Sequence, residues 1–217
     1  MLVVPLRNRV DPFGHIHAVA ERGLFTGNRG VIHDASDKTL TSRRWTTKAW
    51  IVCTLEHPGG VRRDPMGRNT PGGRAGWTEL FFLDEVTALA AGHRPCLYCR
   101  REAAKDFQRR FADGNNLQHA SAPRMDALLH GQRMVSGDAG ARTLVGDPTS
   151  LPDGAMIAAG GVAYAVKDGL ALPWSFGGYG TVGASIVGQP ITLITPPSTL
   201  AALREGYRPV WHPSVES

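Results

Sequence analysis

Cysteine is scarce in this chain, and long apolar runs are absent. Only 3 of the 217 residues are cysteine, too few and too unevenly spaced for a disulfide framework. No stretch approaches the roughly 18–20 consecutive apolar residues that a membrane-spanning helix needs. The first residues also lack the apolar block and cleavage site of a signal peptide. We therefore expect a protein of the cytoplasm that does not enter a membrane.

What remains is the composition of an ordinary globular protein. Hydrophobic residues make up 42% of the chain, enough to bury a core in one large domain or two small ones. The formal net charge is +5, and most of the excess positive charge falls around the three cysteines. The sequence therefore predicts a metal site beside a basic surface.

Composition and turn signals predict an α+β protein in four segments. Residues 1–48 form a polar, glycine-rich segment packed on the core, and residues 49–112 form the cysteine-containing module. Residues 113–144 are a helical linker. Residues 145–217 are rich in β-branched and alanine-containing runs, which favour a small antiparallel sheet or barrel.

Local patterns predict how the chain reaches the cysteines. The apolar run 49–55 predicts a buried strand that ends near Cys53, and the run 77–83 predicts a second strand. Asp84 is placed as the N-cap of a short helix that ends at Gly92. The chain then reaches Cys96 and Cys99, and a helix follows over 98–111.

Further along the chain, three features are predicted. A second short helix covers 123–133, and a hairpin turn is formed by the residues Lys167-Asp168-Gly169. A final helix is expected to be capped by Ser198. The run 172–179 is expected to be an aromatic loop that covers a hydrophobic core or, alternatively, walls a pocket.

The spacing of the cysteines indicates a metal site. In Cys96-Leu-Tyr-Cys99, two thiolates from one turn point at a single ion, as in structural zinc sites. Cys53 and His57, which are separated by three residues, supply the other two ligands, and a Cys3His zinc site results. His93 is the rival for the fourth position. The alternative is that the three cysteines are unrelated core thiols.

These residues resemble the metal-binding module of the Ada DNA-repair proteins. LFFLDEVTALA followed by AGHRPCLYCRR is similar to that family's aromatic strand, alanine-rich helix and Arg-Pro-Cys-x-x-Cys-Arg turn, and the likeness covers about residues 50–111. The resemblance implies a DNA-binding zinc module whose first cysteine, here Cys53, accepts a methyl group from a phosphotriester. His57 stands where the family has a cysteine.

Basic and aromatic residues around the module predict a nucleic-acid-binding face. Arginine and lysine would follow the phosphates and tryptophan would stack on bases; a solvated basic surface is the alternative. The predicted contact residues are Arg43, Arg44, Trp45, Lys48, Arg62, Arg63, Arg94, Arg100 and Arg101.

A second region with polar catalytic residue types lies between Gly14 and Asp34. A histidine beside a carboxylate can act as a general base, so His33 and Asp34 are catalytic candidates. A pocket is also expected there, with the lining residues His15, His17, Arg29, Trp174 and Tyr179.

Three functions follow from these patterns. The first is a zinc-stabilised DNA-binding protein that repairs or processes modified or alkylated DNA, with RNA as the other polyanion to consider. The second is an enzyme that excises bases from, or hydrolyses, nucleic acid, with a purely structural zinc and a site formed by segments 14–34 and 172–179. The third is a non-catalytic binding or regulatory module.

Overall fold

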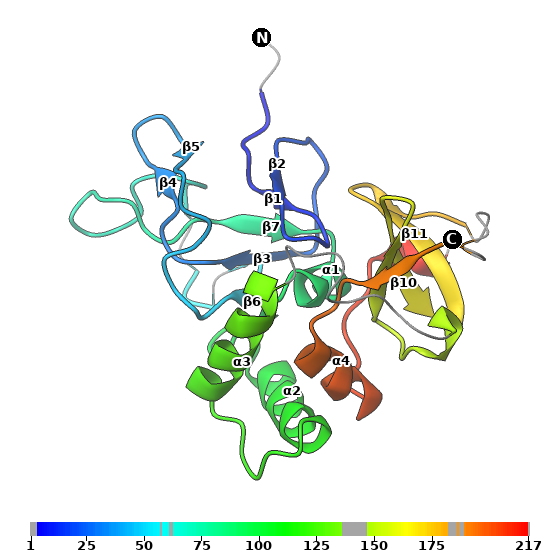
Figure 1. Cartoon of the computed structure of the whole chain (residues 1–217). Coiled ribbons are helices and arrows are strands. Elements are labelled where there is room, and N and C mark those ends of the chain that lie inside the picture. The colour runs from blue at the N-terminus through cyan, green and yellow to red at the C-terminus, as the bar shows by residue number, and fades with distance from the viewer. Residues whose placement is uncertain are drawn as a thin grey trace.

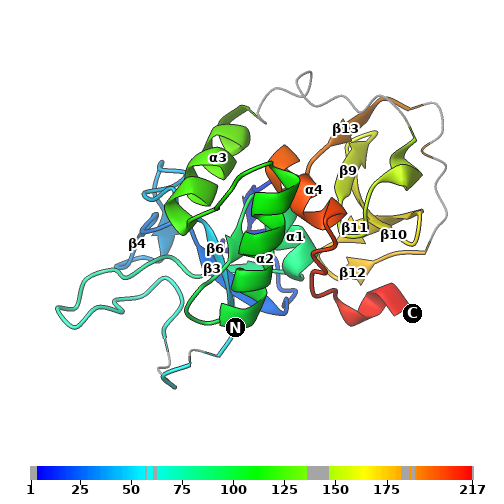
Figure 2. The ribbon, with the colours of Figure 1, turned by 90° about the horizontal axis from the view of Figure 1, so that it is seen from below.

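The chain folds into two main β-sheets joined by helices. The structure is a computed structural model that describes residues 4–56, 58–60, 63–135, 147–181, 186 and 189–216. The N-terminal and C-terminal sheets lie on opposite sides of helix α1 (Glu85–Ala90), and the other helices lie beneath them (Figures 1 and 2). The α+β class predicted from the sequence is confirmed.

Six short strands form the N-terminal sheet, in the order β2-β1-β7-β3-β6-β8. Their bounds are Arg9–Val10 (β1), Ile16–His17 (β2), Phe25–Asn28 (β3), Ile51–Thr54 (β6), Leu80–Phe82 (β7) and Arg94–Pro95 (β8). The pairs β1–β7 and β6–β8 are parallel, and the other pairs are antiparallel. Segments 1–48 and 49–112 therefore contribute strands to one sheet. A separate hairpin joins β4 (His33–Asp34) to β5 (Thr39–Leu40).

Helix α1 is the element on which three parts of the core meet. All six of its residues are buried. Ala88 packs on the N-terminal sheet, Leu89 on the other helices, and Val86 on the C-terminal sheet. Asp84 caps the helix as predicted, because its carboxylate accepts from the Thr87 N–H at 2.8 Å. Gly92 follows with φ +83°, a left-handed conformation that favours glycine at a helix end.

Three longer helices pack together under the N-terminal sheet. They are α2 (Arg101–Gly114), α3 (Ala122–Val135) and α4 (Pro197–Arg204). Phe107, Leu129 and Leu203 lie in their shared core. The prediction that Ser198 caps α4 is wrong. The cap position is Pro196, which offers no side-chain acceptor, and the Ser198 hydroxyl instead accepts from the Gln132 amide at 2.7 Å.

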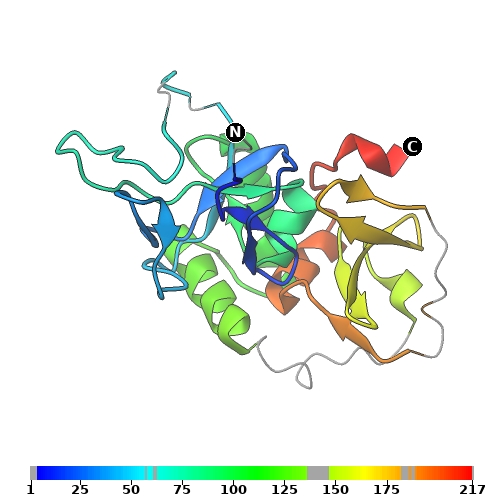
Figure 3. The same ribbon diagram turned by 90° about the horizontal axis from the view of Figure 1, so that it is seen from above.

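The C-terminal region forms the predicted antiparallel sheet, in the order β12-β11-β10-β9-β13 (Figure 3). Its strands are Met156–Ala159 (β9), Val162–Lys167 (β10), Leu170–Ser175 (β11), Gly178–Tyr179 (β12) and Ile191–Leu193 (β13), flanked by 3-10 turns at Pro148–Ser150 (η2) and Pro213–Glu216 (η3).

Two predictions for this sheet, the hairpin turn at Asp168 and Gly169 and the loop at 172–179, have different outcomes. The hairpin turn between β10 and β11 is confirmed, with Asp168 and Gly169 at positive φ. The run 172–179 is not a loop, because it belongs to β11 and β12. Its aromatic residues do cover a core: Tyr179 is buried in the cluster around Val86 and Trp174 packs against it.

Within the described residues, no helix is long and apolar enough to cross a membrane.

Replacing Asp84 with alanine should destabilise the fold. Its carboxylate accepts from Thr87 N–H and hydroxyl, the Tyr179 hydroxyl and the His212 N–H, at 2.7–3.1 Å. Buried donors without an acceptor cost about 1–3 kcal/mol each and a lost N-cap about 1 kcal/mol. We expect the free energy of unfolding to fall by about 2–5 kcal/mol in urea denaturation.

The matched control is Asp113→Ala, an exposed aspartate in α2. It should change stability by no more than about 0.5 kcal/mol. If Asp84→Ala were as mild as the control, the capping network would not hold the sheets on α1.

Candidate metal centre

The register of two parallel strands brings the first two cysteines together. Strand β6 pairs with β8 so that Val52 lies opposite Pro95, and the Cys96 N–H donates to the Val52 carbonyl at 3.0 Å. Cys53 and Cys96 directly follow this pair, so their side chains are neighbours. Cys99 returns to the same point through a tight turn, in which the Arg100 N–H donates to the Cys96 carbonyl at 2.9 Å.

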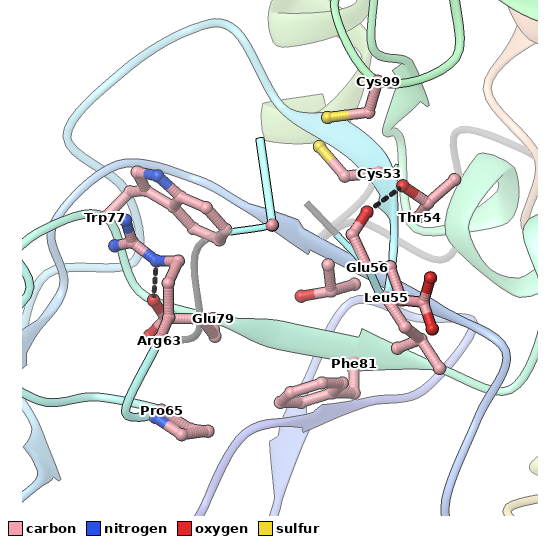
Figure 4. A pocket seen from close by; sticks show the side chains of 12 residues that line it. Cys53, Thr54, Leu55, Glu56, Arg63, Pro65, Trp77, Glu79, Phe81 and Cys99 are labelled. Atoms are coloured by element: carbon pink, nitrogen blue, oxygen red, sulfur yellow. Dashed lines mark hydrogen bonds and ion pairs between the residues drawn. The ribbon is translucent and has the colours of Figure 1, made fainter. Parts of the chain in front are cut away.

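The three sulfur atoms all lie within 4.8 Å of one another. Cys53 and Cys96 are buried and Cys99 is half-buried. The Cys53 and Cys99 side chains point toward each other (Figure 4). Three thiols at this separation can bind a metal ion, and sulfur donors of this kind select soft or borderline metals.

The protonation of the three thiols is coupled. The hydrogen bond from Cys53 lowers the pKa of Cys96 to about 5 against the opposing effect of burial, and nearby backbone N–H groups assist. The pKa of Cys53 is raised by that same hydrogen bond and by burial, and burial with the charge of Cys96 raises the pKa of Cys99. The lowered pKa favours the thiolate at Cys96, and the raised pKa values favour the thiol at Cys53 and Cys99. A divalent cation bound to the sulfurs would favour the thiolate at all three.

Two histidines were predicted as alternatives for the fourth ligand. His57, the residue predicted for that position, lies outside the described residues. His93, its rival, is not among the described residues that gather with the cysteines. Its buried ring packs between Trp50 and Phe82, with centroid distances of 5.1 and 4.6 Å, and its Nε2 accepts from Arg29 at 3.4 Å.

A cavity of about 470 Å³ opens beside two of the sulfurs. Cys53 and Cys99 line it, whereas Cys96 does not. Trp77, Glu79 and Phe81 line it as well, because side chains two residues apart project from the same face of an extended segment. Figure 4 shows these three side chains on one side of the cavity, with Leu55 and Glu56 across from them.

The wall formed by Trp77 is held by an ion pair. Arg63 donates to Glu79 at 2.6 Å, and its guanidinium lies over the Trp77 ring at 4.1 Å from the centroid. The other Glu79 oxygen accepts from the Met66 N–H at 2.8 Å. Arg63 therefore orients the indole while its charge is neutralised. Glu79 and Phe81 were not predicted as cavity residues, although their alternation with Trp77 in the sequence is the signal that would have identified them.

No protein family, curated protein or solved structure matches this chain.

The predicted basic face divides into buried and exposed residues. Arg94 is buried and donates two hydrogen bonds of 2.8 Å to Asp126, and Arg100 donates two of 2.7 Å to Glu85. Burial alone lowers the pKa of Arg100, but the hydrogen bonds and charge of Glu85 outweigh it and raise that pKa. These two arginines, like Arg63, have their charges neutralised inside the fold. Arg43, Arg44, Lys48 and Arg101 are exposed, and Arg62 lies outside the described residues.

A group of positive charges surrounds Trp50 beneath the exposed part of this face. The guanidinium carbons of Arg29 and Arg133 lie 4.0 and 4.1 Å from the Trp50 ring centroid, and that of Arg44 lies at 5.9 Å. Burial, and after it repulsion by Arg44 and Arg133, lowers the pKa of Arg29 to about 9. Burial also lowers the pKa of Arg133 to about 9, with Asp126 opposing this shift and repulsion by Arg44 and Arg94 adding to it. Trp45 packs nearby, 4.6 Å from the His130 ring.

The predicted catalytic residues His33 and Asp34 have different hydrogen-bond partners. Consecutive residues of β4 point to opposite faces, so His33 is buried and Asp34 exposed. The Nδ1 of His33 is 2.6 Å from the Thr78 hydroxyl, while Asp34 accepts from the N–H and hydroxyl of Ser36. Those two hydrogen bonds lower the pKa of Asp34. Both residues serve local structure in the described fold.

The predicted pocket residues are also divided. His15 and His17 gather around Asp11, a residue that the sequence analysis did not single out. Trp174 and Tyr179 instead hydrogen-bond to Thr87 and Asp84 at the start of α1, at 3.0 and 2.7 Å. Arg29 donates to the Gly14 carbonyl at 2.8 Å.

Replacing Cys96 with serine should abolish stoichiometric metal binding. Cys96 is the thiol with the lowered pKa, and it hydrogen-bonds to both of the other thiols. Binding of structural zinc contributes about 10–16 kcal/mol in small zinc domains, so its loss should also lower the melting temperature. Elemental analysis after gel filtration, paired with thermal unfolding, measures both effects.

Tyr98→Ala is the matched control, since Tyr98 lies between the two ligands of the turn and is 68% exposed. It should retain the metal. Equal metal content in Cys96→Ser and Tyr98→Ala would show that the three thiols do not form the site. His57→Ala tests the fourth ligand separately, and there we expect weakened metal retention.

Proposed function

We propose that this protein is a zinc-thiolate, nucleic-acid-binding protein that acts in the repair or processing of modified DNA. The observation that carries the proposal is that two of the three clustered thiols line a cavity instead of being sealed in the core. A purely structural site has no need of such access. The resemblance to the Ada module gives the same centre a chemical role.

Zinc is the metal that best suits the donor set. Three thiolates with a neutral imidazole, supplied by His57 in this proposal, form a monoanionic tetrahedral site of the kind zinc occupies in proteins. The turn Cys96–Cys99 supplies two sulfurs at the spacing typical of such sites.

Cys53 is the proposed acceptor of an alkyl group. Its sulfur would attack the methyl carbon of a phosphotriester; the S–C bond forms as the C–O bond breaks, and the phosphodiester leaves with the bonding electron pair. Cys53 lines the cavity, and Trp77 and Phe81 offer flat apolar walls beside it. Coordination by zinc would keep the sulfur deprotonated at neutral pH.

The basic residues around Trp50 support a polyanionic partner. Exposed Arg43, Arg44 and Lys48 lie in the same loop segment, and Arg44 also belongs to the group with Arg29 and Arg133. Burial, and after it repulsion by neighbouring arginines, lowers the pKa values of Arg29 and Arg133. A phosphate backbone would relieve that repulsion, which favours DNA or RNA over a neutral partner.

A second candidate is a nucleic-acid-directed hydrolase or base-excising enzyme with a structural zinc. One contact favours it: the His17 ring meets the Phe176 ring at a centroid distance of 5.2 Å, so segments 14–34 and 172–179 do touch. A non-catalytic binding module is the third candidate.

Methyl transfer to Cys53 is tested with methylphosphotriester DNA. The intact protein should gain the mass of one methyl group per molecule, and peptide mapping by tandem mass spectrometry should locate it on Cys53. Cys53→Ser should not gain it, and Trp77→Ala should gain it more slowly because the cavity wall is lost. Methyl found on another residue, or no gain by a zinc-loaded, folded protein, would contradict the chemical role.

Nucleic-acid binding is tested by salt titration of the wild-type protein on duplex and single-stranded DNA. Arg44→Ala and Lys48→Ala should each weaken binding and reduce the slope of log K against log salt by about one if each contacts a phosphate. Arg204→Ala, an exposed arginine on α4, is the control and should leave the slope unchanged. Affinity that is absent or insensitive to salt would remove the nucleic-acid partner from the proposal.

A further inference from the structure

We propose that Asp11, His15 and His17 form a second metal site, for a divalent transition metal with nitrogen and oxygen ligands. One carboxylate oxygen and one ring nitrogen from each histidine lie within 4.8 Å of one another. The three residues belong to the hairpin between β1 and β2, and none of them takes part in the cysteine centre. The site is therefore independent of the function proposed above.

The hairpin backbone sets this arrangement before any metal binds. The Gly14 N–H donates to the Asp11 carbonyl at 2.9 Å, and the Asp11 N–H donates to the His15 carbonyl at 3.1 Å. Gly14 has φ +85°, a conformation that side-chain-bearing residues rarely adopt, so the turn requires glycine. His15 and His17 are two residues apart on the returning segment, which directs both rings to one face.

The carboxylate of Asp11 is oriented toward both rings. Its Oδ1 accepts from the His15 N–H at 2.8 Å, which leaves Oδ2 to face the histidines. Oδ2 is 2.8 Å from the His17 Nε2 and 3.4 Å from the His15 Nδ1. Ligand atoms about 2.1 Å from one ion are roughly 3.0–3.4 Å apart in octahedral or tetrahedral geometry. The two carboxylate-to-ring separations, 2.8 and 3.4 Å, span this range, and the two ring nitrogens lie within 4.8 Å of each other, so rotation of the rings would bring all three ligand atoms to one ion.

The three proposed ligands differ in exposure: one is buried and two face solvent, so a metal ion could reach the site from solution. The Asp11 side chain is only 10% exposed, whereas those of His15 and His17 are 73% and 41% exposed. The inner ligand is held by the fold, and the outer face is open to further ligands such as water. The His17 ring is supported by Phe176 at 5.2 Å, and the His15 ring stacks on Phe13 at 6.3 Å.

The donor set determines which metals this site accepts. Two imidazoles and one carboxylate with open positions suit Zn²⁺, Fe²⁺, Mn²⁺ or Co²⁺, and lack the thiolates that favour Cu⁺. Arg29 donates to Gly14 in the same turn and interacts with the charge of Asp11. That positive charge lowers cation affinity, so we expect a metal that exchanges readily and is removed by mild chelation, unlike one held by the cysteines.

The experiment is a metal titration of the zinc-loaded chain of residues 1–217. After dialysis against a mild chelator, Co²⁺ is added and binding is followed by calorimetry and absorption. The wild-type protein should bind one further equivalent without the sulfur-to-cobalt charge-transfer band that thiolate ligation produces. His15→Ala and His17→Ala should each weaken this binding at least about tenfold, while the chelator-resistant metal of the cysteine centre stays in place.

His119→Ala is the matched control, an exposed histidine outside the hairpin, and it should bind Co²⁺ as the wild-type protein does. Circular dichroism of each variant ensures that folded proteins are compared. Absence of the additional equivalent in the wild-type protein would overturn the proposal. So would histidine variants that bind as tightly as the wild type, or loss of the additional equivalent in His119→Ala. Failure of the alkyl-transfer or DNA-binding tests would leave this result unaffected.

Discussion

Two adjacent buried carboxylates at the start of α1 hold the rest of this structure together. Asp84 receives hydrogen bonds from the helix itself, from Tyr179 of the C-terminal sheet and from His212 near the C-terminus. Glu85 accepts from Arg100 and from the Tyr207 hydroxyl at 2.6 Å. Burying two carboxylates costs free energy unless their oxygens accept hydrogen bonds. Here donors from four parts of the chain supply those hydrogen bonds.

The same network reaches the metal centre. Arg100 follows Cys99 directly, and its pairing with Glu85 anchors the turn Cys96–Cys99 to α1. The parallel register of β6 with β8 then determines where Cys53 meets that turn. The three thiols are thus placed by a sheet on one side and by a buried ion pair on the other.

The arginines illustrate why residue type alone does not identify a binding face. Arg94 and Arg100 lie beside the cysteines in the sequence and were expected to contact phosphate, but both are paired with carboxylates inside the fold. Their partners, Asp126 and Glu85, are distant in sequence, so no local sequence pattern predicts the pairing. Arg29 and Arg133 lie over the Trp50 ring, where burial and the charges of neighbouring arginines lower the pKa of each to about 9.

The sequence by itself determined the features that depend on contacts within a few residues: the Asp84 cap, the turn at Asp168 and Gly169, the short helices and the close pair Cys96 and Cys99. Only the tertiary structure decided that Cys53 joins this pair, that a cavity opens beside it, and that Asp11 faces two histidines. It also decided that the His33 side chain is buried while the Asp34 side chain is exposed. These outcomes depend on strand register and on which face of a strand is buried, and both are set by packing between segments far apart in the chain.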